Sequence, residues 1–350
     1  MGKSLYVILG NGFTIDLIYF LRENSNLAHD IDVGNFFKYG AEVIYPETNE
    51  PGFLSSKHCP NLWNLGARPG MDAKEALEII ENIITSVNVY ASHPRKAELA
   101  KSKQNDIYFF AYLELIEYIR NLFVLYDKKI KYFPNKIRDW SWFKFLKSAS
   151  KHYDKIYIVT YNYDVWMERI FDKMGIKYSI YGLSGQEEAE SSIIIFKPHG
   201  SISFLHNLTR EPSEYRIDTQ KEIKNLPIQD YSLDYSFEKI SRTNAIIPPA
   251  SEAGRMQQED NSWSKTIHNA VIEQFKQSQD TDDCVISGIS YWHVDRNEID
   301  NIIVNLNSKI SLKMINPNAP KSLIAVLTSL FDNFVLYPKS NILERIIKND

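Results

Sequence analysis

Short apolar runs recur along this chain, and their alternation with helical patterns restricts the possible fold more than any other feature. Several of the runs are near-continuous and bounded by Gly, Pro or Asn, which is typical of strands buried on both faces. The predicted strands cover residues 4–10, 155–161, 192–198, 244–249, 283–289 and 309–315, and 334–338 is a weaker candidate. This alternation predicts an α/β fold with a Rossmann-like parallel sheet flanked by helices.

The residues between the first and second predicted strands have a different character. Leu113, Ile116, Ile119 and Phe123 share one face of a helical pattern. The predicted helices of this block are 73–91, 105–127 and 139–152, preceded by a loop rich in Pro and Gly at 45–70. We therefore predict a core of residues 1–22 and 154–350, and a loop plus all-helical insertion at 23–153. The polar stretch 205–243 is predicted to be a surface excursion.

Composition excludes several classes of protein. The chain has 350 residues and a net charge of −4, which gives no sign of a nucleic-acid-binding surface. No stretch approaches the ~20 apolar residues that span a bilayer, and the N-terminus lacks the features of a signal peptide. Cys59 and Cys284 are the only cysteines, too few for a four-thiolate zinc site. We expect a cytoplasmic protein without a metal site.

The first predicted strand ends in a glycine loop. Gly10 and Gly12 could let the backbone approach a phosphate, with amide groups of the following helix facing the anion. The full dinucleotide fingerprint needs a third glycine, and that position holds Ile15. A tight strand-to-helix turn explains the same residues equally well.

Polar residues also follow the later strands, where ligands bind in open parallel sheets. Asn162 and Asp164 follow the second strand, although either could serve as a helix cap. His199 precedes Gly200, and its pKa would suit proton transfer near neutral pH, although a lone His-Gly is more often a turn. Small polar residues that suit ribose hydroxyls or ordinary turns end the fifth and sixth strands: Gly288, Ser290 and Asn316.

The order of these signals is more informative than each alone. The sequence GxGxT, TxNxD, HG, GxS and IN resembles the motif order of the sirtuin family, and in particular the bacterial sirtuin-like NAD hydrolases of antiphage defence. The resemblance covers residues 1–22 and 154–337. Two features of sirtuin deacylases are absent, the four-cysteine zinc module and the GxPDFR-like stretch, which puts protein deacylation in doubt.

The resemblance implies that the chain cleaves NAD⁺ to nicotinamide and ADP-ribose. Asn162 would contact the nicotinamide-side ribose and an ordered water, Asp164 would bond the carboxamide, and His199 would act as general base. Thr14 and the glycine loop would hold the diphosphate, while Ser290 and Asn316 would face the adenosine ribose. The predicted NAD-contacting residues are Gly10, Asn11, Gly12, Phe13, Thr14, Asp16, Thr160, Gly288, Ser290 and Asn316.

Other functions remain open at this point. A zinc-free deacylase or ADP-ribosyltransferase would use the same residues, and a non-catalytic module could sense NAD or ADP-ribose. A dehydrogenase is disfavoured because the third glycine is missing.

The resemblance also implies regulation and partners. Relatives of this size often assemble with themselves or with a separately encoded ATPase or nuclease. Aromatic residues on several faces of the 105–127 helix, among them Tyr108, Phe109 and Tyr118, predict a homo-oligomer interface, or a helix buried all round. We also predict a mobile gate. The favoured candidate is segment 45–70, with Trp63 and Arg68 closing over NAD, and the other candidate is the polar excursion 205–243.

Overall fold

The computed structural model describes residues 2–91, 107–185, 187–217, 226–248, 262–291 and 296–343. The chain divides into two compact units. The first comprises residues 1–29, 130–198 and 266–350, and the second comprises 30–129 and 199–265. The second unit thus combines most of the predicted insertion with the segment after β6, whereas the predicted helix 139–152 belongs to the first unit.

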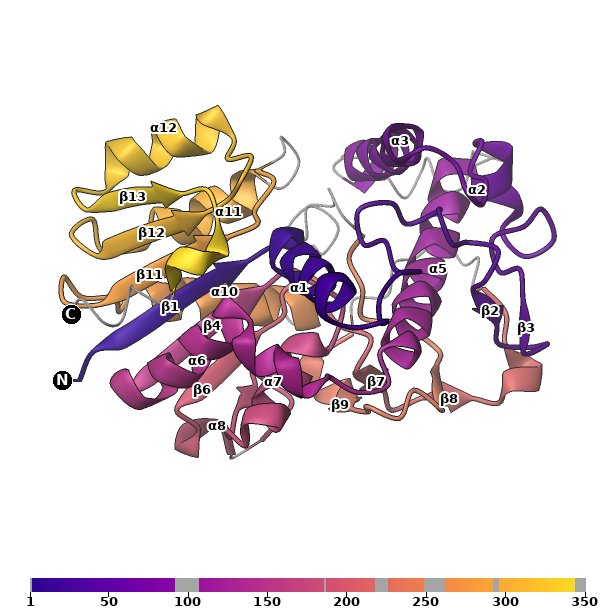
Figure 1. The fold of residues 1–350 in the computed structure, drawn as a ribbon. Helices are drawn as coiled ribbons and strands as arrows, with labels where there is room; N and C mark the ends of the chain where they lie inside the picture. Colours follow the sequence, from indigo (N-terminus) through magenta and orange to yellow (C-terminus); the bar gives the residue numbers. More distant parts are fainter. Residues whose placement is uncertain are drawn as a thin grey trace. The chain divides into compact units, whose positions relative to one another are not determined.

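A seven-stranded sheet, parallel throughout, forms the centre of the first unit (Figure 1). The strand order is β13-β12-β11-β1-β4-β6-β5. The strands are β1 (Ser4–Leu9), β4 (Lys155–Thr160), β5 (Ser179–Ile180), β6 (Ile193–Phe196), β11 (Asp283–Ser287), β12 (Ser311–Ile315) and β13 (Phe334–Tyr337). This is the predicted Rossmann-like fold.

The central position of β1 determines where a ligand can enter this sheet. From β1 the chain builds outward through β4, and it later returns to the other side of β1 with β11. The strand order therefore reverses between β1 and β11, and such switch points leave a crevice at the carboxyl ends of the strands. Leu9 lies opposite Thr160 on one side and Ser287 on the other, so the residues that follow all three strands meet at one edge.

Helices cover both faces of the sheet (Figure 1). Phe275 of α10 packs edge-on against Tyr6 of β1, with ring centroids 5.0 Å apart. Phe13 of α1 packs at 5.2 Å against Trp142 of α6. The helices of this unit are α1 (Asn11–Asn24), η1 (Asn135–Asp139), α6 (Ser141–His152), α7 (Trp166–Met174), α8 (Glu187–Glu190), α11 (Arg296–Ile303), α12 (Lys321–Leu330) and η4 (Ser340–Ile342), and α10 (Trp263–Phe275) begins in the second unit.

The second unit is built around the long helix α5. The Tyr118 hydroxyl donates to the Phe36 carbonyl at 2.6 Å, and the Tyr118 ring contacts Phe37 and Phe53. Its helices are α2 (Pro60–Asn64), α3 (Ala73–Ala91), α5 (Ile107–Lys129), η2 (Pro212–Glu214) and η3 (Ile228–Asp230). Its antiparallel strand pairs are β2 (Ile44–Tyr45) with β3 (Glu50–Pro51), β7 (Phe204–His206) with β9 (Tyr231–Leu233), and β8 (Thr209–Arg210) with β10 (Ile240–Ser241).

Most predicted helices match the observed ones, although residues 105 and 106 lie outside the described residues. The β2–β3 hairpin lies at the predicted loop 45–70, ahead of the helical block of the insertion. The predicted strand 244–249 is wrong. Ile246 makes a single bridge with Gly200, and Pro248, which has no N–H, cannot extend the pairing; residue 249 is not described.

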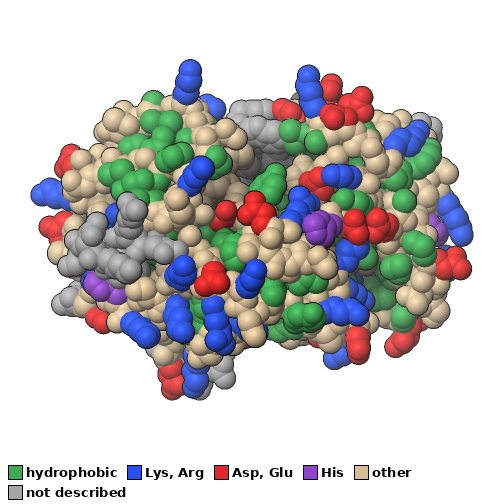
Figure 2. All heavy atoms as spheres, in the orientation of Figure 1, with side chains coloured by type: hydrophobic (Ala, Val, Ile, Leu, Met, Phe, Trp, Pro, Cys, Tyr) green, Lys and Arg blue, Asp and Glu red, His purple; other side chains and the backbone are tan. Residues whose placement is uncertain are grey.

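Two further predictions concern surfaces. Phe109 and Tyr118 are buried within the second unit, whereas Tyr108 is 38% exposed, so burial accounts for much of the aromatic content of α5. No helix in the described ranges has the length and apolarity needed to cross a bilayer. Figure 2 shows acidic and basic side chains interspersed over the visible face.

Candidate functional site

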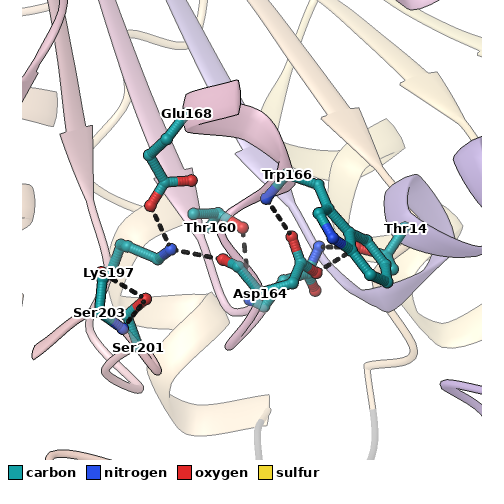
Figure 3. Close-up of polar contacts among 9 residues, drawn as sticks. Thr14, Thr160, Asp164, Trp166, Glu168, Lys197, Ser201 and Ser203 are labelled. Carbon is teal, nitrogen blue, oxygen red and sulfur yellow. Dashed lines mark hydrogen bonds and ion pairs between the residues drawn. The ribbon is translucent and has the colours of Figure 1, made fainter. Parts of the chain in front are cut away.

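Residues from two distant parts of the sequence meet at the carboxyl edge of β1 and β4. The Asn162 side-chain nitrogen donates to the Gly10 carbonyl at 3.1 Å and to the Thr14 hydroxyl at 2.9 Å. The Thr14 hydroxyl donates to the Asp164 carboxylate at 2.7 Å (Figure 3). The sequence prediction that Gly10 and Asn162 share one edge of the sheet is confirmed. This cluster is called the edge network below.

The amide of Asn162 has a fixed orientation. The Gly10 carbonyl can only accept, and the Thr14 hydroxyl gives its own hydrogen to Asp164, so both partners require the nitrogen of Asn162. The side-chain oxygen of Asn162 makes no hydrogen bond to any residue that the structure describes. It is therefore a pre-oriented acceptor for a hydroxyl group or a water molecule.

Asp164 shapes the start of helix α7. Its Oδ1 accepts the amide of Trp166 at 3.0 Å, which is an Asx-type turn, and its Oδ2 accepts the Thr14 hydroxyl. The side chain is 4% exposed. The capping-like alternative considered for Asp164 thus describes part of its role, and the bond to Thr14 adds a link to α1.

Three glycines allow the loops after β1 and β11 to touch. A Cβ atom on Gly12 would lie 2.4 Å from the Gly288 Cα, and one on Gly10 would lie 2.5 Å from the Gly288 carbonyl oxygen. The Gly12 amide donates to that carbonyl at 3.2 Å. Gly288 itself has a φ of +66°. The glycine pattern therefore meets a backbone requirement at the switch point.

Other predicted NAD-contacting residues have different environments. Asn11 and Ser290 are exposed, whereas Phe13 is buried against Trp140 and Trp142. The Thr160 hydroxyl accepts the main-chain N–H of Asn162 at 3.3 Å.

Asp16 and Asn316 have partners within the first unit. Asp16 accepts the Trp140 indole N–H at 3.2 Å, and burial raises the pKa of its carboxyl group. Asn316 donates to the Ile289 carbonyl at 3.2 Å and accepts the Asn318 amide at 3.0 Å. The side chain of Asn316 thus steadies the Gly288–Ser290 turn.

His199 is the first residue of the second-unit stretch 199–265, and it directly follows residue 198 of the first unit. It is 4% exposed, and its carbonyl accepts the Ile247 amide at 3.0 Å. Gly200 has a φ of +82°, and a Cβ atom there would lie 1.7 Å from the Ala245 carbonyl oxygen. The His-Gly pair therefore has a strict backbone requirement at its glycine.

Sequence reasoning missed a buried ion pair beside the edge network. Lys197, which follows β6, places its ammonium group 2.6 Å from the Glu168 carboxylate of α7. It also donates to the Asp164 carbonyl at 2.6 Å (Figure 3). The available signal was a lysine at the end of an otherwise apolar run, an unusual position for a residue that is almost never fully buried unless paired.

This geometry agrees with a comparison against protein families. Residues 157–243 match the SIR2-like domain family. The matched segment contains Thr160, Asn162, Asp164 and His199, and it is consistent with a sirtuin-like family that uses NAD. A comparison with curated proteins finds no match. Among the described residues, no three His, Cys, Asp or Glu side chains gather as a metal site would require.

Proposed function

We propose that this chain is an NAD⁺ glycohydrolase that cleaves NAD⁺ to nicotinamide and ADP-ribose. The observation that carries the proposal is the fixed side-chain amide of Asn162 at the carboxyl edge beside the switch point of the sheet, whose oxygen has no hydrogen-bond partner among the described residues. The SIR2-like match over the same residues supports NAD as the substrate.

The reaction breaks one bond and forms another at ribose C1′. Nicotinamide leaves as a neutral molecule with the electron pair of the N-glycosidic bond, and positive charge develops on the ribose, as in glycoside cleavage. Water then adds to C1′ and releases a proton. The side-chain oxygen of Asn162 would accept a hydrogen bond from the ribose hydroxyl or from the attacking water. His199 would accept a proton as general base.

The edge network would supply orientation. A reacting group that is already held in position loses less entropy when it reaches the transition state, so the activation barrier is lower. A displacement of about 1 Å can lower the rate by ~10²-fold. The Thr14 hydroxyl accepts the side-chain nitrogen of Asn162 at 2.9 Å and is itself held by its 2.7 Å hydrogen bond to Asp164. We assign Thr14 to this role, because its hydroxyl already donates to Asp164 and accepts from Asn162.

We also propose that the activity serves antiphage defence by depleting NAD in the infected cell. The support is the resemblance of the motif order to defence-associated NAD hydrolases. A homo-oligomer, or assembly with an ATPase or nuclease partner, would fit this role and is proposed on the same basis.

The purified chain incubated with NAD⁺ tests the chemistry. Chromatography should resolve nicotinamide and ADP-ribose in equal amounts, and would also reveal cyclic ADP-ribose. Asn162→Ala and His199→Ala should each lower the rate by ~10² to 10⁴-fold, as expected when a positioned acceptor or a general base is lost. His152→Ala, at an exposed histidine at the end of α6, is the matched control.

Two other outcomes would change the conclusion. Turnover that requires an acylated peptide would favour a zinc-free deacylase, and transfer to protein would favour an ADP-ribosyltransferase. Calorimetric binding of NAD without turnover, under conditions that include a candidate partner, would favour a sensing module. Full activity in both Asn162→Ala and His199→Ala would place the chemistry elsewhere.

A further inference from the structure

The Lys197–Glu168 ion pair is almost completely buried. The exposed fractions of the two side chains are 0% and 1%, and the nitrogen–oxygen distance is 2.6 Å. Both groups lie in the first unit. Removing two charges from water costs several kcal/mol per ion, and a well-packed apolar pair of similar volume is often as stable or more stable. Stability alone is therefore a weak explanation for this pair.

The carboxylate of Glu168 depends on Lys197. Its Oε1 accepts the ammonium group, whereas its buried Oε2 has no hydrogen-bond partner among the described residues. Burial raises the pKa of Glu168, and the adjacent ammonium of Lys197 opposes that rise. Lys197 is thus the one ion-pair partner of Glu168 among the residues that the structure describes.

The second contact of Lys197 leads to the edge network. The ammonium group donates to the main-chain carbonyl of Asp164 at 2.6 Å. The side chain of the same residue accepts the Thr14 hydroxyl, and Thr14 in turn accepts the Asn162 amide. Lys197 therefore contacts the main chain of the residue whose side chain accepts the Thr14 hydroxyl (Figure 3).

We propose that Lys197 and Glu168 form a positioning pair, which clamps the Asp164 turn and thereby fixes the amide of Asn162. The pair joins the end of β6 to the first turn of α7 and to the loop after β4. Because the two side chains are 0% and 1% exposed, the pair would act through Asp164 and not by contact with a bound substrate. Its catalytic consequence rests on the proposed NAD glycohydrolase activity, whereas its effect on the Asp164 turn does not.

The amide of Trp166 reports on this turn independently of activity. Trp166 is the first residue of α7, so its N–H has no acceptor within the helix, and Asp164 Oδ1 supplies one at 3.0 Å. If Lys197 holds the Asp164 turn, loss of the clamp should increase hydrogen exchange of this amide. A role confined to global stability would leave it unchanged relative to other amides of α7.

The decisive variant is Lys197→Met/Glu168→Met, which replaces the pair with apolar side chains of similar size and should preserve the fold. We expect an unchanged thermal midpoint, at least tenfold faster exchange of the Trp166 amide, and a kcat lowered by ~10²-fold with KM within about threefold. Lys313→Met is the matched control. Lys313 also pairs with a buried carboxylate, Asp283, but at the amino-terminal edge of the sheet, where Lys3 and Tyr153 still hold that carboxylate.

Each outcome is decisive. Retained kcat in the folded double variant overturns the proposal, and so does unchanged exchange of the Trp166 amide. If this variant does not fold, Lys197→Met/Glu168→Gln is measured in the same way; failure of both to fold makes the pair a requirement of folding and also overturns the proposal. Absence of NAD turnover in the wild type rejects the proposed function alone, because the exchange measurement still decides whether the pair holds the turn.

Discussion

At the scale of single residues, the hydroxyl group of Thr14 joins the two polar side chains that follow β4. It donates to Asp164 and accepts from Asn162, and it is 1% exposed. Thr14→Val keeps the shape but leaves a buried carboxylate oxygen and an amide hydrogen without this partner, which costs about 2 kcal/mol. We expect Thr14→Val to lower NAD turnover by ~10²-fold through the displaced Asn162. Thr14→Ser, which retains the hydroxyl, should stay within about fivefold, and equal activity of the two variants would show that the hydroxyl has no such role.

Two glycines with similar φ values allow the cost of a left-handed backbone conformation to be distinguished from the cost of steric overlap. Gly288 and Gly175 have φ values of +66° and +69°. An added Cβ at Gly288 would meet backbone atoms of Gly12 at 2.4 and 2.5 Å, whereas at Gly175 nothing lies within 4 Å. Gly175→Ala should cost about 1 kcal/mol of unfolding free energy, from the left-handed conformation alone. Gly288→Ala should cost about 3 kcal/mol, because the overpacking adds to it. Denaturant unfolding measures both, and equal losses would refute the close-approach explanation.

The residue scale also shows what sequence can and cannot predict. The meeting of Gly10 with Asn162 follows from parallel strands whose carboxyl ends share an edge, and the structure confirms it. The bridging role of Thr14 does not follow, because the strand pattern brings the loop residues to one edge but does not determine which of their side chains form hydrogen bonds. The pairing of Lys197 with Glu168 could not be predicted either, because a lysine at the end of an apolar run can indicate burial but does not identify its partner.

At the scale of elements, the carboxylate of Glu114 on α5 caps the helix α2. Its oxygens accept the amides of Asn61 at 3.1 Å and Leu62 at 2.8 Å, where the first turn of a helix lacks acceptors of its own. We expect Glu114→Ala to lower the stability of the second unit by about 2 kcal/mol. Glu42→Ala is the control, since its exposed pair with Lys129 should contribute less than about 1 kcal/mol. Similar losses in the two variants would contradict the capping role.

Helix α2 lies within the predicted gate at 45–70. Arg68 donates to the carbonyl of Trp63 at 2.6 Å and stacks on its ring at 3.9 Å, so both residues are already engaged within the second unit. Phe53, Leu54 and Leu62 of the segment are buried. The abundance of Pro and Gly predicted a loop, and the segment consists mainly of turns and loop, although it also contains most of the hairpin β2–β3 and the short helix α2. The gate therefore stays a prediction, and these contacts give Trp63 and Arg68 a structural role.

Asp283 at the start of β11 gives the sheet a dependence on pH. Burial alone would raise the pKa of this carboxyl group, but the bonds from Lys3 and Tyr153 and the charge of Lys313 outweigh burial and lower it. A lowered folded-state pKa stabilises the protein above the unfolded-state pKa of about 3.9, and this stabilisation is lost as the pH falls through the folded-state value. Asp283→Asn should therefore be less stable than the wild type at pH 7, and the difference should shrink below about pH 4. A constant difference across an acid titration would exclude this linkage.

At the scale of the whole molecule, the fold class could be predicted because alternating strands and helices leave few arrangements. The division into units could not, because the polar segment 205–243 carries no periodic signal that links it to the helical insertion. Eight of its residues, 218–225, lie outside the described residues. The homo-oligomer stays a prediction, since burial within the second unit accounts for Phe109, Tyr112 and Tyr118.

The proposed activity places a constraint on the whole molecule inside a cell. An unregulated NAD hydrolase would drain the cell that makes it, so the resting enzyme must turn over slowly until a trigger or partner acts. We expect cells that express the chain at a moderate level to keep NAD within about twofold of the empty control. During infection by a phage that the chain restricts, NAD should fall by at least tenfold, whereas cells with Asn162→Ala should keep their NAD and lose protection. Mass spectrometry of NAD, nicotinamide and ADP-ribose over one infection cycle measures this. A fall in NAD without infection would show that the enzyme is constitutive, and protection with unchanged NAD would reject depletion as the mechanism of defence.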